Sequence, residues 1–228
     1  MIASISDEFF RRTDGRYRID AFPAGQLYNI KTLPEAVQLG VVQIGYEVSS
    51  VASKKPLSLL AAPNLFAGHD HWQRYMASAT AKQLFDEVEA QEARRVVAPI
   101  YWGEHHITAN KPLRTPADLK GLKMRYLTSP GVASFLRAAG ATPQAIVFGE
   151  AEIALMHGIV DSHENTLNGF RSINTKAVQK TLNLTGHAIE TLFVVANSRT
   201  LAAMWDSDRQ AFIEIVAAAA SRLGAEVR

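Results

Sequence analysis

The fold is decided by residues 116–168, which read PADLKGLKMRYLTSPGVASFLRAAGATPQAIVFGEAEIALMHGIVDSHENTLN. The short apolar runs at 123–126 and 144–147 are typical of strands. Between them Ser129-Pro130 predicts the start of a helix, since Ser caps a helix and Pro suits its first turn, and Gly140 predicts its end. A strand, a helix and a second strand in this order predict a parallel β-α-β unit.

The rest of the chain continues this alternation of strands and helices. Apolar residues at helical spacing predict a helix over residues 81–93, and apolar or alternating runs predict further strands. The strands expected outside the opening stretch are residues 16–22, 41–46, 96–101, 182–185 and 191–196. We therefore expect an α/β fold with mainly parallel sheets.

The composition excludes several classes of protein. The chain has 228 residues, 47% of them apolar and 20% charged, which is enough to fill a folded core. It has no cysteine, and this excludes a disulfide scaffold, a thiol enzyme and a cysteine metal site. The net charge is only +2 and basic residues cluster at most in pairs, so we expect no nucleic-acid partner.

The sequence as given has no targeting or membrane-spanning pattern. Its longest apolar runs, such as residues 216–220, fall far short of the roughly 20 residues that cross a bilayer. Its start, MIASISDE, lacks the basic and apolar regions of a signal peptide.

The common catalytic motifs are missing as well. No G-x-G-x-x-G, P-loop, G-x-S-x-G or H-E-x-x-H sequence occurs. Two histidine clusters leave one alternative open, a metal-assisted hydrolase that uses Glu104 and His105 with His69 or His71. Nothing in the spacing requires these segments to meet, so we expect no metal and no other cofactor.

Arg125 is the residue that suggests a binding site. It lies at the carboxyl end of a predicted strand, four residues before the helix start at Ser129. Ligands of open α/β sheets bind outside the carboxyl ends of strands, and both a helix N-terminus and a guanidinium favour an anion. Phe148, after the next strand, offers an apolar wall, and Asn165 can donate amide hydrogens. The pattern predicts an anion pocket without a nucleophile or an obvious base.

This stretch, with motifs on either side of it, resembles the substrate-binding proteins of tripartite ATP-independent periplasmic (TRAP) transporters. The most specific part of the resemblance is the order of Arg125, Phe148 and Asn165 among the surrounding glycines. The other matching motifs are FPAGQL (22–27), EAVQLG (35–40), TPADLKGLKMR (115–125), GATP (140–143), FGE (148–150) and IVDSHEN (159–165).

The resemblance implies a two-lobed, periplasmic-binding-protein-like fold with a hinge between the lobes. Residues 1–102 and 191–228 would form the first lobe, without its first strand, and residues 103–190 the second lobe, which carries the carboxylate site. Arg125 would pair with the ligand carboxylate. The ligand-binding residues expected in full are Arg125, Asn165, Phe148, Glu47, His105 and Trp102.

The function that the resemblance implies is that of an extracytoplasmic solute receptor. Such a protein would bind a small organic acid in the periplasm and deliver it to the membrane subunits of a TRAP transporter. We expect it to be a monomer, to carry no cofactor and not to be an enzyme.

The chain departs from the family pattern in two respects. His105 stands where many relatives carry a second cleft arginine, and a neutral imidazole offers a hydrogen bond but no fixed charge. The chain also begins inside what resembles the first helix and stops early. We therefore expect a sequence that is shortened at both ends.

Overall fold

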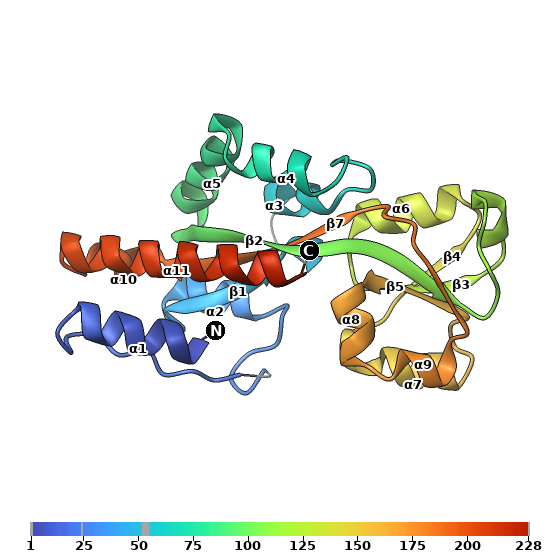
Figure 1. The fold of residues 1–228 in the computed structure, drawn as a ribbon, viewed down its shortest axis with the longest axis horizontal. Coiled ribbons are helices and arrows are strands. Elements are labelled where there is room, and N and C mark those ends of the chain that lie inside the picture. Colours follow the sequence, from blue (N-terminus) through green and yellow to red (C-terminus); the bar gives the residue numbers. More distant parts are fainter. Residues whose placement is uncertain (1, 24, 52–54, 228) are drawn as a thin grey trace.

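The computed structural model describes residues 2–23, 25–51 and 55–227. Figure 1 shows an elongated molecule in which two groups of helices are joined by the long strands β2 (Arg94–Ala109) and β7 (Ile189–Asn197). We call the group that contains both ends of the chain the first lobe and the other group the second lobe.

The first lobe has helices on both faces of its part of the sheet. Phe9 and Phe212 pack against one face, and Val37 and Leu57 against the other. Its elements are α1 (Ile2–Arg12), α2 (Leu33–Leu39), β1 (Ile44–Val48), η1 (Ser49–Val51), α3 (Lys55–Ser58), η2 (Leu59–Ala61), α4 (His69–Met76), α5 (Ala79–Glu92), α10 (Ser198–Ala202) and α11 (Asp206–Val227), with β7 and the first half of β2.

The second lobe is built around three short parallel strands. Its helix α6 (Pro130–Ala138) begins where the sequence predicts, because the Ser129 hydroxyl accepts a hydrogen bond of 3.3 Å from the Val132 N–H. The other elements are η3 (Pro116–Leu119), β3 (Lys123–Tyr126), β4 (Thr142–Ala145), η4 (Phe148–Glu150), α7 (Ala151–Met156), β5 (Ser162–Thr166), α8 (Leu167–Ser172), α9 (Thr175–Val178) and β6 (Thr181–Asn183).

The sheet is mixed, so the prediction of mainly parallel sheets is wrong. Its strand order is β1-β7-β2-β5-β3-β4, with β6 also paired to β2. Among the described residues only the pairs β3–β4 and β3–β5 are parallel, while every pair that involves β2 or β7 is antiparallel. The reason is that β2, with 16 residues, runs through both lobes without a helical crossover, and its neighbours return alongside it. The α/β class itself is observed.

The strand predicted at residues 16–22 is also wrong, since these residues form no ladder in the described structure. Alternation of polar and apolar side chains is typical of a strand, but a strand also needs a neighbouring strand with which to exchange hydrogen bonds. Here Tyr17 and Ile19 pack onto the core of the first lobe without such pairing.

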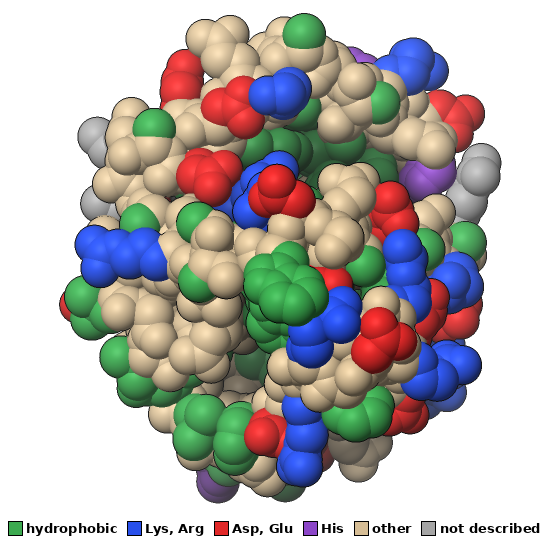
Figure 2. All heavy atoms as spheres, turned by 90° about the vertical axis from the view of Figure 1, so that its left-hand side faces the viewer, with side chains coloured by type: hydrophobic (Ala, Val, Ile, Leu, Met, Phe, Trp, Pro, Cys, Tyr) green, Lys and Arg blue, Asp and Glu red, His purple; other side chains and the backbone are tan. Residues whose placement is uncertain are grey.

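The described helices include none that is both long and apolar enough to cross a membrane. Figure 2 shows the end of the first lobe, where basic and acidic side chains intermingle and hydrophobic side chains form separate patches. Neither sign of charge dominates this face.

Candidate functional site

The candidate site lies where the carboxyl ends of β3, β4 and β5 meet. In the parallel ladders Arg125 of β3 is paired with Gln144 of β4 and with His163 of β5. Thr128, two residues after β3, donates its hydroxyl to the backbone carbonyl of Ser50 at 3.1 Å. This edge of the second lobe therefore contacts the first lobe, as expected for the ligand-binding edge of an α/β sheet.

Arg125 is buried at this edge, with 1% of its surface exposed. Its Nε donates to the carbonyl of Ile146 at 2.9 Å, and its guanidinium carbon lies 6.0 Å from the centre of the Phe148 ring. Its Nη2 has no hydrogen-bond partner among the described residues. Burial lowers the pKa of Arg125, with Glu164 acting against that shift, but a guanidinium still stays charged. A buried cation with an unused donor is suited to an anionic ligand.

His163 connects Arg125 to Asn165. Its Nε2 lies 3.0 Å from Nη1 of Arg125 and 3.3 Å from Nδ2 of Asn165, and since both neighbours are donors, Nε2 is the acceptor. Burial and the charge of Arg125 lower the pKa of His163 to about 3, so the ring is neutral. A single neutral imidazole thus orients both polar residues that the sequence predicts as ligand contacts.

The amide of Asn165 is fixed from two further sides. Its Oδ1 accepts from the N–H of Thr166 at 2.8 Å, so its NH2 group is the part turned toward His163. Gly169, in the first turns of α8, packs directly against this amide, and a Cβ at position 169 would overlap it. The Thr166 hydroxyl accepts from the N–H of Gly169 at 3.2 Å and caps the helix, which keeps Gly169 in place.

The structure thus brings together three of the predicted ligand residues, Arg125, Phe148 and Asn165, and places the other three elsewhere. Glu47 is buried on β1, where it forms an ion pair with Arg94, which also pairs with Glu92. Trp102 is half-buried and lines a pocket of about 280 Å³. Glu47, Trp102 and His105 therefore stay predictions as ligand contacts.

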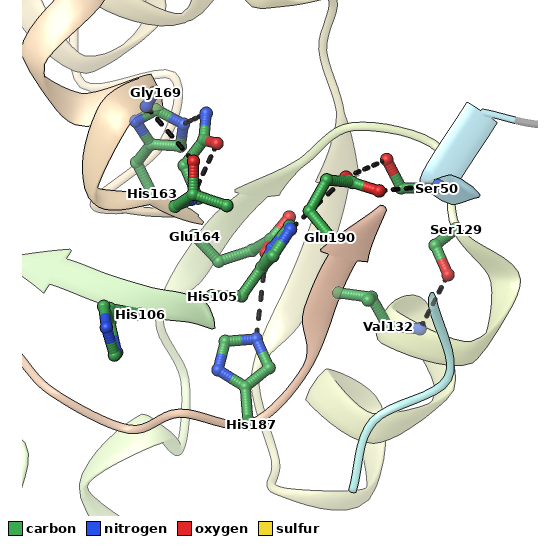
Figure 3. Close-up of polar contacts among 12 residues, drawn as sticks. Ser50, His105, His106, Ser129, Val132, His163, Glu164, Gly169, His187 and Glu190 are labelled. Carbon is green, nitrogen blue, oxygen red and sulfur yellow. Dashed lines mark hydrogen bonds and ion pairs between the residues drawn. The ribbon is translucent and has the colours of Figure 1, made fainter. Parts of the chain in front are cut away.

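His105 belongs to a buried network where β2, β5 and β7 meet (Figure 3). Its Nδ1 is bonded to Glu164, and its Nε2 lies 3.3 Å from Oε2 of Glu190. The hydroxyls of Ser49 and Ser50 donate to the same Glu190 at 2.5 and 2.6 Å. Burial opposes protonation of His105, but the two carboxylates outweigh it and raise its pKa to about 10. The charge of His105 is therefore compensated inside the protein.

Two residues of the alternative hydrolase, His69 and Glu104, line the same pocket of about 280 Å³, but His105 is bonded to Glu164 in the buried network instead. His69 lies 3.2 Å from its neighbour Asp70, and His71 accepts from the N–H of Ala67. In the part of the chain that the structure describes, the side chains that meet His105 in a potential metal-ligating group are Glu164 and His187.

His163 is a residue of the site that was not predicted from the sequence. In the strand SHENT side chains alternate between the two faces, so His163 and Asn165 share one face and Glu164 occupies the other. That alternation was readable from the sequence. The position of His163 beside Arg125 was not, because it depends on the parallel pairing of β3 with β5.

Residues 3–227 match a family model described as bacterial extracellular solute-binding protein, family 7. The solute-binding protein RD1_1052 of Roseobacter denitrificans is 28% identical over 214 residues, which are 93% of this chain and 66% of that protein. The 2,3-diketo-L-gulonate-binding periplasmic protein YiaO of Escherichia coli is 30% identical over 213 residues, 91% of this chain and 64% of that protein. This chain therefore spans about two thirds of the length of these relatives.

Solved structures agree with these sequence matches. The crystal structure of the Roseobacter TRAP periplasmic solute-binding protein with bound L-galactonate has a TM-score of 0.88 and 27% identity, and covers 99% of this chain and 75% of its own. A TRAP periplasmic solute-binding protein from Shewanella oneidensis with bound succinate has a TM-score of 0.89 and 25% identity, with coverages of 99% and 74%. These proteins are periplasmic binding proteins rather than enzymes, which confirms the class and location that the sequence predicts.

Proposed function

Because the chain belongs to family 7 of the bacterial extracellular solute-binding proteins, we propose that it is a TRAP solute receptor that binds a small organic acid through Arg125. The observation that carries this proposal is the buried Nη2 of Arg125, which has no partner among the described residues. A ligand carboxylate placed there gains charge-assisted hydrogen bonds from Arg125, and Phe148 and Asn165 lie close enough to contact the rest of the ligand.

The ligand that fits best carries one carboxylate. Arg125 is the buried cation of this site, whereas the charge of His105 is already balanced by Glu164 and Glu190. A second ligand carboxylate would lack a fixed positive partner and would be costly to bury. The Roseobacter relative was crystallised with L-galactonate, and YiaO is named for 2,3-diketo-L-gulonate. Both are sugar acids with a single carboxylate, which supports a sugar acid as the ligand of this chain.

Binding is coupled to closure of two lobes around the acid. We place the first lobe at residues 1–102 and 191–228 and the second at 103–190, so that β2 and β7 form the hinge. The hydrogen bond from Thr128 to the carbonyl of Ser50 joins the lobes three residues after Arg125. A ligand that contacts both lobes at this edge favours the closed arrangement, because only that arrangement allows the contacts with both lobes. Delivery to TRAP membrane subunits rests on the family alone.

Calorimetric titration with matched ligands tests this proposal. L-Galactonate is compared with galactitol, which replaces the carboxylate by a neutral hydroxymethyl group, and with the dicarboxylate succinate. We expect one galactonate or related sugar acid per chain, no detectable galactitol binding, and weaker binding of succinate. Native mass spectrometry of the purified protein should show a co-purified acid.

Two results would count against the receptor proposal. One is galactitol binding as tightly as galactonate. The other is a folded protein that binds no acid in a screen of sugar acids, hydroxy acids and dicarboxylates.

A further inference from the structure

A second polar cluster lies beside the candidate anion site. His105 of β2, Glu164 of β5 and His187, two residues before β7, are at most 4% exposed. One potential ligand atom from each of the three lies within 4.8 Å of the other two. Figure 3 shows the three side chains converging from different segments of the chain, with Glu190 next to them.

The outer nitrogen of each imidazole has a partner of its own. Nε2 of His105 lies 3.3 Å from Oε2 of Glu190, and Nδ1 of His187 lies 2.8 Å from Oγ1 of Thr185. Once His105 gives up the proton that it shares with Glu164, donation of the remaining N–H of each ring to these oxygens leaves Nδ1 of His105 and Nε2 of His187 with lone pairs that face Glu164. Metal-binding histidines in proteins show this arrangement, in which the outer N–H is held by a carboxylate, a carbonyl or a hydroxyl.

His187 provides a separate observation. Its Nε2 is buried, has no hydrogen-bond partner among the described residues, and lies 3.7 Å from Oε2 of Glu164. Its ring stacks on Phe135, with centroids 5.1 Å apart and an angle of 5°, so the ring is held in this orientation. With the ring proton on Nδ1, Nε2 presents a buried lone pair to this carboxylate, which is unfavourable unless a cation lies between the two.

We propose that His105, Glu164 and His187 form a binding site for one divalent transition-metal ion, with zinc as the ion that fits best. Two imidazole nitrogens and one carboxylate oxygen suit zinc, cobalt or nickel, whereas calcium and magnesium prefer oxygen ligands alone. The ion takes the place of the proton that His105 shares with Glu164, and this proton leaves to solvent.

The position of the cluster gives the ion a structural effect. Its three ligands come from β2, from β5 and from the segment that leads into β7, so the ion would fasten these segments where the lobes join. Thr185, which contacts His187, is exposed on the loop between β6 and β7. The cluster is therefore separated from solvent by a short loop.

A Co²⁺ and Zn²⁺ titration of the whole chain tests this site in the absence of any organic acid. The protein is purified without a metal column or histidine tag and dialysed against a chelator. We expect one Co²⁺ per chain with the visible absorption of a low-symmetry nitrogen and oxygen site, displacement by Zn²⁺, and a higher melting temperature with Zn²⁺. Since no acid is present, the result does not depend on the proposed receptor function.

The variant His187→Gln removes a ligand, and His157→Gln removes an exposed histidine outside the cluster as the matched control. We expect Co²⁺ affinity to fall at least about tenfold in the first variant and to stay unchanged in the second. Absence of stoichiometric metal binding by the folded wild-type protein overturns the proposal without need of any variant. Equal metal binding by wild type and folded His187→Gln overturns it too.

Discussion

Replacement of Arg125 by Ala is the most direct perturbation of the proposed carboxylate site. In the wild type, a bound carboxylate would pair with a guanidinium that is 1% exposed and held by Ile146 and His163. Removing one partner of a buried, hydrogen-bonded charge pair costs about 2–5 kcal/mol, because the other charge stays buried and unpaired. At about 1.4 kcal/mol for each factor of ten, the dissociation constant should rise from about 30-fold to several thousand-fold.

The assay is calorimetric titration with the best sugar acid from the ligand comparison, at one pH and one salt concentration. Arg125→Lys keeps a positive charge without the planar fork, so its affinity should lie between those of wild type and Arg125→Ala. Arg137→Ala, at an exposed position on α6, is the matched control and should bind as the wild type does. Melting curves confirm that each variant is folded. An affinity of folded Arg125→Ala within about threefold of wild type would refute the reasoning, because truncating one partner of a buried charge pair should cost at least about 2 kcal/mol, or about 30-fold.

Three further predictions concern the neighbours of Arg125 and the hinge network. Asn165→Ala removes a donor to a charged ligand, so acid affinity should fall by about 1–3 kcal/mol, or about 5- to 150-fold, in the same titration, and unchanged affinity would exclude Asn165 from the site. Gly169→Ala places a methyl group on the amide of Asn165, so we expect both weaker acid binding and a lower melting temperature; wild-type affinity in this variant would show that the amide is not a ligand contact. His105→Gln tests the network by pH. Because the folded pKa of His105 is raised from 6.5 to about 10, its stabilising effect is complete below about pH 6.5 and is lost as the pH rises toward 10. Burial acts to raise the pKa of Glu164, but the charge and hydrogen bond of His105 outweigh burial and hold this pKa well below 4.5. The stabilisation that Glu164 contributes is therefore lost as the pH falls. Urea unfolding in a chelator should therefore show the largest difference between wild type and His105→Gln near pH 5–6, and a constant difference up to pH 10 would contradict the ion-pair account.

Local signals in the sequence were sufficient to predict several elements of the second lobe. Residues 123–126 form the predicted strand, and α6 begins at Pro130 behind its Ser129 cap, because strand propensity and capping act within a few residues. The approach of Phe148 to Arg125 agrees with the predicted order of strands, since the carboxyl ends of parallel strands lie at one edge, whereas the place of Asn165 depends on the pairing of β5 with β3.

Features that depend on pairing between distant parts of the chain could not be predicted from the sequence. The length of β2 and its antiparallel partners decide the sheet type, and neither is encoded in a window of ten residues. Glu47 shows the same limit, since the family resemblance implies a ligand contact but does not reveal that the pairing of β1 and β2 with β7 brings Glu47 to Arg94. A charged residue at the end of a strand is as well explained by an internal partner as by a ligand, and only the tertiary structure distinguishes the two.

The strand β5 makes the two proposed sites close neighbours while keeping them chemically distinct. His163 and Asn165 face Arg125 and the proposed carboxylate, whereas Glu164, between them in sequence, faces His105 and the proposed metal ion. Any substitution of Glu164 would change the hinge network and displace the backbone that carries both ligand-site residues. A Glu164 variant would therefore not separate the two proposals. Arg125 and His187 each belong to one site alone, so the pair of variants Arg125→Ala and His187→Gln should separate acid binding from metal binding, each losing one and retaining the other.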